Sequence, residues 1–81
     1  MIGAMPEPRR GPALPWQRVA ASLRERVTGG EWVPGEALPS VRALAAEYGV
    51  SPPTVSRAVR VLADEGLLTV VPGWGTFVTE R

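Results

Sequence analysis

The side chains that could do chemistry in this sequence are arginines and hydroxyl residues in the second half of the chain. Arg42, Arg57 and Arg60 could bind phosphates or a guanine edge, because a guanidinium donates two parallel hydrogen bonds in one plane. Ser51 and Thr54 could offer hydroxyls to a phosphate from the start of a helix. The chain has no Cys and no His, which excludes thiol nucleophiles, ordinary zinc sites and the usual base of a serine triad. The arginines and hydroxyl residues favour an anionic partner, and we expect neither enzymatic activity nor a cofactor.

The size and charge of the chain limit the forms that such binding could take. With 81 residues, 44% of them hydrophobic, the chain fits one small domain. Nine basic residues, all Arg, nearly balance eight acidic residues and leave a net charge of +1. Binding to nucleic acid would therefore depend on where the arginines lie. No run approaches the roughly 20 apolar residues that cross a bilayer, and the first residues lack the apolar segment of a secretion signal, so we expect a cytoplasmic protein.

The first predicted helix runs from Pro15 to the Gly29-Gly30 pair, which would end it. Its apolar residues recur at the spacing of one helix face. They are Trp16, Val19, Ala20, Leu23 and Val27. The next stretch, residues 31–39, contains two prolines and is predicted to be a loop with at most two extended residues, around Ala37-Leu38. We expect Trp16 and Trp32 to be buried in the core.

Two shorter helices are predicted to follow, joined by a turn of about three residues. Ser40 would cap the first of them and Gly49 would end it. The next helix would open at Ser51, which is a good cap, and stop at Gly66. Two amphipathic helices with a short turn that contains Gly are typical of a helix-turn-helix, in which the second helix can lie in a major groove.

Two starts are possible for this last helix, because prolines stand at positions 52 and 53. Ser51 could be its N-cap, with the helix beginning at Pro52. Proline also disfavours helical geometry in the residue before it, so the helix could begin at Pro53 with Pro52 as the flanking residue. In either case, each proline removes a backbone N–H that would otherwise point at a phosphate.

The last segment predicts a β-hairpin. Two β-branched and apolar runs, Leu67 to Val71 and Thr76 to Thr79, flank a Gly-rich tip at residues 72–75. Three helices followed by a hairpin predict a mainly α fold, the winged helix-turn-helix, with a two- or three-stranded wing. We assign residues 13–81 to this domain and residues 1–12, which contain Arg9 and Arg10, to a flexible N-terminal arm.

In order and spacing, these residues resemble the N-terminal DNA-binding domain of the GntR family of bacterial transcription regulators. The resemblance covers Pro15 to Val78. The residues that carry it are Leu23–Val27, Gly30-Glu31, Pro34-Gly35, Leu38-Pro39-Ser40, Arg42, Leu44-Ala45, Tyr48–Ser51, Thr54-Val55, Ala58-Val59, Leu62, Glu65–Leu68, Gly73 and Gly75–Val78.

The resemblance implies that the domain reads DNA through an Arg early in the second helix, residues at the start of the third helix, and the wing tip in the minor groove. Arg42, Thr54 and Gly73 match such positions. Arg57 stands where a second basic residue often appears in the family.

The sequence departs from the family pattern at three positions. These are Pro52 and Ser56, where an Arg is common, and Trp74, where a basic wing residue is usual. Trp74 has two interpretations: it could stack against sugars and bases in a minor groove, or fold back as a small apolar patch or protein contact.

A helical wheel of the third predicted helix shows which side chains leave the core. Pro53, Arg57, Arg60 and Asp64 project outward, and Ser56 lies on the flank. Arg57 and Arg60 are therefore expected to face a groove, while Asp64 would repel phosphates. The full set of candidate DNA-contacting residues is Arg42, Ser51, Pro53, Thr54, Ser56, Arg57, Arg60, Gly73 and Trp74.

The leading hypothesis is a sequence-specific transcription regulator that binds double-stranded DNA, and we expect a repressor. Family regulators usually carry a further domain for effector binding and dimerisation; we expect neither that domain nor a small-molecule effector site in this chain. A second copy or a partner protein on a neighbouring half-site would raise its affinity. Two alternatives stay open: a protein-interaction adaptor that uses Trp74, and a small architectural or recombination factor that bends DNA.

Overall fold

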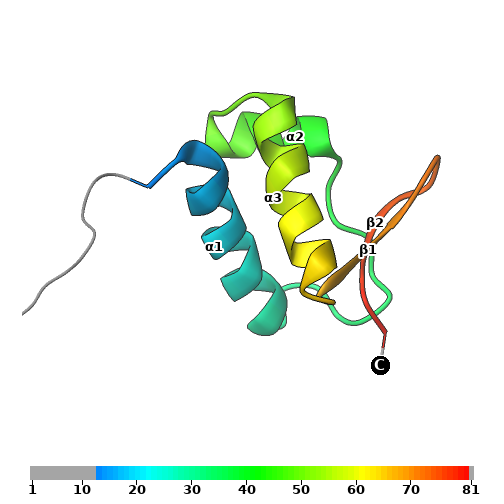
Figure 1. Ribbon diagram of the computed structural model, residues 1–81. Coiled ribbons are helices and arrows are strands. Elements are labelled where there is room, and N and C mark those ends of the chain that lie inside the picture. The colour runs from blue at the N-terminus through cyan, green and yellow to red at the C-terminus, as the bar shows by residue number, and fades with distance from the viewer. Residues whose placement is uncertain (1–12, 81) are drawn as a thin grey trace, which may run out of the picture.

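Three helices followed by a hairpin make up the part of the chain that the structure, a computed structural model, describes, which is residues 13–80 (Figure 1). The elements are α1 (Pro15–Thr28), α2 (Val41–Tyr48), α3 (Pro52–Asp64), β1 (Leu68–Val71) and β2 (Gly75–Val78). The predicted order of three helices and a wing is therefore confirmed. The arm proposed for residues 1–12, with Arg9 and Arg10, lies outside the described residues.

The helix α3 is the central element of the fold. It contacts α1, α2 and β1, and Figure 1 shows it between α1 and the hairpin. Within residues 13–80 the core contains no buried polar or charged residue. Its members are Val19, Ala20, Leu23, Val27, Trp32, Leu38, Leu44, Ala45, Val55, Ala58, Val59, Leu62, Leu68 and Val78. Burying one of the valines or leucines stabilises the fold by about 1.5–3 kcal/mol, so this core fixes which face of α3 points outward.

The ends of α2 form as the sequence predicts. The Ser40 side chain accepts a hydrogen bond from the backbone N–H of Ala43 at 3.0 Å. Gly49 has a left-handed φ of 69°, which a residue with a side chain adopts at a cost. Its position turns the chain directly into α3 and so fixes the angle of the helix-turn-helix.

The two tryptophans predicted for the core behave differently. Trp32, in the loop before α2, is buried with 8% of its surface exposed, which confirms the prediction. Trp16, in the first turn of α1, packs at the margin of the core and is only partly buried. The prediction for Trp16 was therefore only partly right, because the side chain lies under a charged residue of α3 instead of under apolar ones.

The wing is a two-stranded antiparallel sheet in which Leu68 pairs with Val78 and Val71 with Gly75. Both predicted strands are present, with boundaries shifted by one residue at Leu68, Gly75 and Val78. The possible third strand is reduced to one bridge between Ala37 and Phe77. Pro39 follows almost at once and has no N–H to donate, which prevents a longer strand.

Candidate nucleic-acid interface

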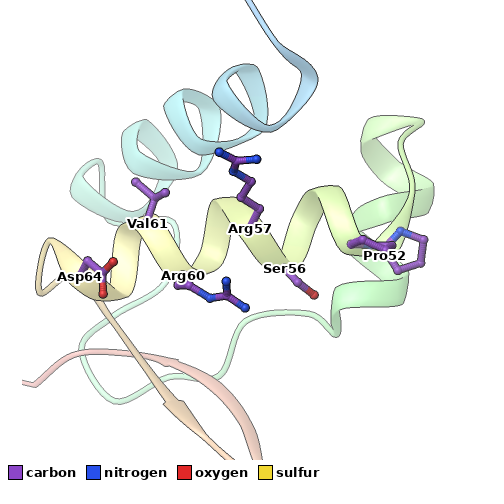
Figure 2. Close-up of a pocket in the computed structure, with 7 residues that line it drawn as sticks. Pro52, Ser56, Arg57, Arg60, Val61 and Asp64 are labelled. Carbon is purple, nitrogen blue, oxygen red and sulfur yellow. The ribbon is translucent and has the colours of Figure 1, made fainter.

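An open groove of about 630 Å³ runs along the outer face of α3 (Figure 2). The residues that line it are Pro52, Pro53, Ser56, Arg57, Arg60, Val61 and Asp64. Pro53, Arg57, Arg60 and Asp64 are all exposed, as the helical wheel predicts. The outer face of α3 thus carries two cations near its middle and a carboxylate at its C-terminal end.

The two arginines diverge across this groove. Figure 2 shows Arg57 pointing toward α1 and Arg60 pointing toward the opposite flank, where Ser56 also lies. Ser56 and Arg60 also line a second cleft, of about 370 Å³, between α3 and the wing. The other residues of this cleft are Val41, Val59, Ala63, Val70 and Thr76. The geometry places one guanidinium on each flank of α3.

The start of α3 differs from the sequence-based prediction. The helix begins at Pro52 with Ser51 as N-cap, so the alternative start at Pro53 was wrong. The prediction that the Ser51 side chain caps the helix was also wrong. Its hydroxyl lies 3.0 Å from the hydroxyl of Thr54, while the Ser51 carbonyl accepts the backbone N–H of Thr54. Prolines at the first two helical positions set this arrangement, because they leave few free amides to attract the serine oxygen.

The start of α2 is more open to an anion. Ser40 satisfies the amide of Ala43, whereas the first two amides of the helix, from Val41 and Arg42, have no acceptor within residues 13–80. Arg42 is exposed at the second position of the helix. Backbone N–H groups at a helix start and a guanidinium both favour a negative partner. The α2 start thus offers main-chain donors that the proline-led α3 start lacks.

Arg26, on α1, is held in a network that joins three elements. It donates to the Glu31 carboxylate at 2.8 and 2.6 Å, and to the Tyr48 hydroxyl at 2.9 Å. It also pairs with Glu47 at 3.0 Å and lies 4.7 Å from the centroid of the Trp32 ring. The hydrogen bond from Arg26 lowers the pKa of Glu31, and the same bond raises the pKa of Arg26. This arginine fastens the loop and α2 to α1.

Arg24, two residues earlier on α1, pairs with the end of α3. Its guanidinium donates to both oxygens of Glu65, at 2.8 and 2.6 Å. The hydrogen bond lowers the pKa of Glu65 and raises that of Arg24. A bidentate pair of this kind joins two elements with defined geometry, although both side chains stay exposed to solvent.

The arginines of the candidate site are not neutralised in this way. No carboxylate in the described part of the chain forms an ion pair with Arg42, Arg57 or Arg60. The net charge of +1 therefore conceals a division between arginines that carry acidic partners and arginines that do not. On the outer face of α3, the positive charge is available to an external anion.

The tip of the wing is exposed and uncharged. The Val71 carbonyl accepts the N–H of Trp74 at 2.9 Å, and Gly73 has a φ of 80°, as a Pro-Gly pair requires in a type II turn. Trp74 is 80% exposed, and Val70 is 51% exposed. Trp74 therefore does not fold back onto the domain. Its exposure suits both a minor-groove contact and a protein contact.

Sequence reasoning missed the pairs that cross between elements. The partners Arg24 and Glu65 are 41 positions apart, and the pairing depends on how α1 packs on α3. The stack of Arg57 on Trp16 likewise joins two helices. Each pair depends on tertiary packing, for which the periodicity of a single helix gives no signal. Only the short separation of Arg26 and Glu31 offered a local indication.

No helix between residues 13 and 80 has the length and apolar character needed to span a membrane. The same residues contain no group of three or more acidic side chains arranged to hold a metal ion.

The sequence and the fold of this domain are similar to those of known proteins. Residues 15–78 match the family described as bacterial regulatory proteins, gntR family. The chain belongs to this family. The match begins at the first residue of α1 and ends at the last residue of β2, so it covers every helix and strand of the GntR-family domain described above.

Two curated relatives are repressors by name. The histidine utilization repressor of Klebsiella aerogenes is 42% identical over 74 residues, covering 91% of this chain and 31% of the relative. The mannosyl-D-glycerate transport/metabolism system repressor MngR of Escherichia coli (strain K12) is 42% identical over 66 residues, covering 82% of this chain and 28% of the relative. This GntR-family chain spans less than a third of the length of either relative.

Solved structures with the same fold include complexes with DNA. AraR(DBD) in complex with operator ORE1 has a TM-score of 0.83 and 28% identity, covering 91% of this chain and 90% of that chain. S. agalactiae BusR in complex with its busAB-promotor DNA has a TM-score of 0.76 and 29% identity, covering 84% of this chain and 33% of that chain. The GntR-family domain is thus a winged helix of the type seen in these complexes.

Proposed function

We propose that this GntR-family domain binds double-stranded DNA with sequence specificity and represses transcription by occupying an operator. The observation that carries the proposal is the outer face of α3, where Arg57 and Arg60 stand exposed and without a carboxylate partner among the described residues. The names of the repressor relatives and the DNA in the two solved complexes support it. DNA binding also implies a position at the nucleoid.

In the proposed complex, α3 lies in the major groove with its outer face toward the base edges. Arg57 and Arg60 would bind a guanine edge or a phosphate, one on each flank of the helix. Ser56 lies beside Arg60 and is short enough to let the helix approach the bases. Pro53 would contribute an apolar contact on the same face.

The two helix starts would contact the phosphates in different ways. At the start of α2, Arg42 would act together with free backbone amides. At the start of α3, the prolines at positions 52 and 53 remove two amides, so Ser51 and Thr54 would have to use their hydroxyls. Those hydroxyls bond to each other in the free protein, and a phosphate would compete for them.

The wing would reach the neighbouring minor groove. Gly73 gives the tip a tight turn, and the exposed Trp74 ring could stack on sugars there without a charged contact. One domain makes few contacts, so a second copy or a partner protein on a neighbouring half-site would increase affinity, and this remains a prediction.

Selection from a randomised duplex pool tests the proposal. The purified protein is bound to the pool at about 50 and 200 mM salt, beside the variants Arg42→Ala and Arg57→Ala. We expect an enriched motif whose binding weakens with salt and is reduced in both variants. Unselective or absent binding by the wild-type protein would refute a sequence-specific regulator.

A second candidate function is a protein-interaction adaptor, which the exposed apolar wing favours. Trp74 is 80% exposed, and no charged residue occurs between Gly66 and Thr79. Binding to a protein through this surface should change little with salt, whereas DNA binding through arginines should weaken steeply. Substituting Trp74→Ala would then abolish partner binding and leave duplex binding largely intact. A third candidate, an architectural factor, predicts a bent duplex in the complex.

A further inference from the structure

Arg57 and Arg60 are both exposed on α3, but of the two only Arg57 rests on an aromatic ring in the described structure. The Arg57 Cζ atom lies 4.5 Å from the centroid of the Trp16 ring. Trp16 belongs to α1 and is itself fixed against the edge of the core. The Arg57 guanidinium therefore lies against a partly buried ring on another helix.

The indole ring of Trp16 is not accounted for by packing alone. Its Nε1 atom is buried and has no hydrogen-bond partner among the described residues. A buried N–H without a partner is unfavourable, and an apolar ring at this position would avoid it. Trp is, however, the side chain whose ring face attracts a guanidinium most strongly. The stack with Arg57 gives a reason for an indole at this position.

The stack leaves the binding groups of Arg57 available. An aromatic ring covers one face of a planar guanidinium, whereas the N–H donors project from its edge. Arg57 forms no ion pair within residues 13–80. A guanidinium whose plane is already fixed loses less freedom when it binds a ligand, so its affinity for that ligand rises.

We propose that Trp16 is a positioning residue for DNA recognition, which presets Arg57 on the α1 flank of α3 for bidentate binding of two acceptor oxygens or nitrogens. The inference rests on the proposed function. The acceptor pair belongs either to a backbone phosphate or to the O6 and N7 atoms of a guanine. Trp16 itself need not touch the DNA, because it acts through Arg57.

A double-mutant cycle tests the inference on the duplex that the wild-type protein selects. The variants are Trp16→Leu, Trp16→Phe, Arg57→Ala and the Trp16→Leu/Arg57→Ala double variant, with the dissociation constant measured for each. We expect Trp16→Leu to weaken binding about two- to fivefold, and Trp16→Phe, which keeps a ring, to weaken it less. Trp16→Leu should have no further effect once Arg57 is absent.

Arg60 provides the matched control, because it lies on the same face and does not stack on Trp16. In an Arg60→Ala background, Trp16→Leu should retain its full effect. Equal effects of Trp16→Leu with and without Arg57 would show a purely structural role and overturn the inference, as would wild-type affinity in Trp16→Leu. Unfolding midpoints show whether each variant is folded. If Trp16→Leu is unfolded, the same cycle is measured with Trp16→Phe in its place.

The Arg57→Ala variant also distinguishes a phosphate acceptor from a guanine acceptor. If Arg57 binds a phosphate, Arg57→Ala lowers the salt slope by about 0.9 and weakens all sequences alike. If Arg57 binds guanine, selectivity relaxes at one base pair and the salt slope changes little.

Failure of the wild-type protein to bind any duplex would overturn the proposed function and this inference together. Wild-type binding with an additive double-mutant cycle would overturn the inference alone.

Discussion

Two arginines of α1 and two of α3 carry the same charge but have different surroundings. Arg24 and Arg26, on α1, donate to Glu65 and Glu31 at distances from 2.6 to 2.8 Å and tie separate elements together. Arg57 and Arg60, on α3, have no such partner in the described residues. The comparison shows that pairing, and not the number of cations, distinguishes a structural arginine from one that can bind an external anion.

This difference also explains why a net charge of +1 is compatible with DNA binding. Glutamates neutralise Arg24 and Arg26 on α1, whereas the outer face of α3 keeps exposed guanidinium groups. Removing a paired arginine should therefore act first on stability. Removing Arg57 or Arg60, which are unpaired and lie on the outer face of α3, should act first on binding.

The largest expected effect is the loss of both α3 arginines. In the Arg57→Ala/Arg60→Ala double variant, affinity for the selected duplex should fall about 100-fold, because each bidentate contact contributes about 1–3 kcal/mol. Titration of a fluorescent duplex measures the change. The urea unfolding midpoint should fall only slightly, since neither side chain pairs with a carboxylate in residues 13–80 and the contact of the exposed Arg57 with the Trp16 ring contributes little to stability. Unchanged affinity would remove α3 from the interface.

Replacing the paired arginine of α1 should give the opposite result. Arg26→Ala should lower the free energy of unfolding by about 2 kcal/mol, because charged hydrogen bonds and a cation–π contact are lost together. Urea unfolding gives the value. Below the transition, the folded variant should bind the duplex with nearly wild-type affinity. A loss of affinity without a loss of stability would contradict the structural role of Arg26.

The two serines that precede α2 and α3 should differ in how much they contribute to the free energy of unfolding. Ser40→Ala should lower the free energy of unfolding by about 1 kcal/mol, because the Ser40 hydroxyl caps α2. Ser51→Ala should cost less than about 0.5 kcal/mol, because its hydroxyl bonds only to Thr54 at the surface. Equal losses for both, measured by urea unfolding, would mean that Ser51 caps α3 after all.

The smallest expected effect concerns the exposed Arg24–Glu65 pair. The hydrogen bond from Arg24 lowers the pKa of Glu65 in the folded protein, so its contribution to stability is present above the ordinary glutamate pKa and is lost as pH falls through the lowered pKa. Glu65→Gln should be slightly less stable than the wild-type protein at pH 7. The difference should shrink below about pH 4.3. A difference that persists into acid would show that the pair contributes through packing instead of charge.

Much of the fold could be predicted from the sequence because its signals are local. Apolar spacing identified the core faces of the three helices, and Ser40 and Gly49 marked the ends of α2. The outward direction of Arg57 and Arg60 follows from the same periodicity. These features need no knowledge of how one helix packs on another.

Features that depend on tertiary packing, or on which backbone amides are free at a helix start, could not be predicted from the sequence. Ser51 was expected to cap α3, but the adjacent prolines change the amides available and its hydroxyl turns to Thr54. Trp16 was expected in the core, but α3 brings Arg57 over its ring. The DNA contacts of Ser51, Arg57 and Arg60 stay predictions.

The most direct test of the central claim is the salt dependence of duplex affinity in two variants that lose the same charge. One is Arg57→Ala/Arg60→Ala; the other is Arg18→Ala/Arg24→Ala, from α1 residues that do not line the α3 groove. The account predicts that duplex affinity falls in the first variant, with a slope of log Kd against log salt that decreases by about 0.9 for each arginine that binds a phosphate, and that affinity and slope both stay at the wild-type value in the second. Equal changes in both would show that total charge, and not the α3 face, holds the DNA.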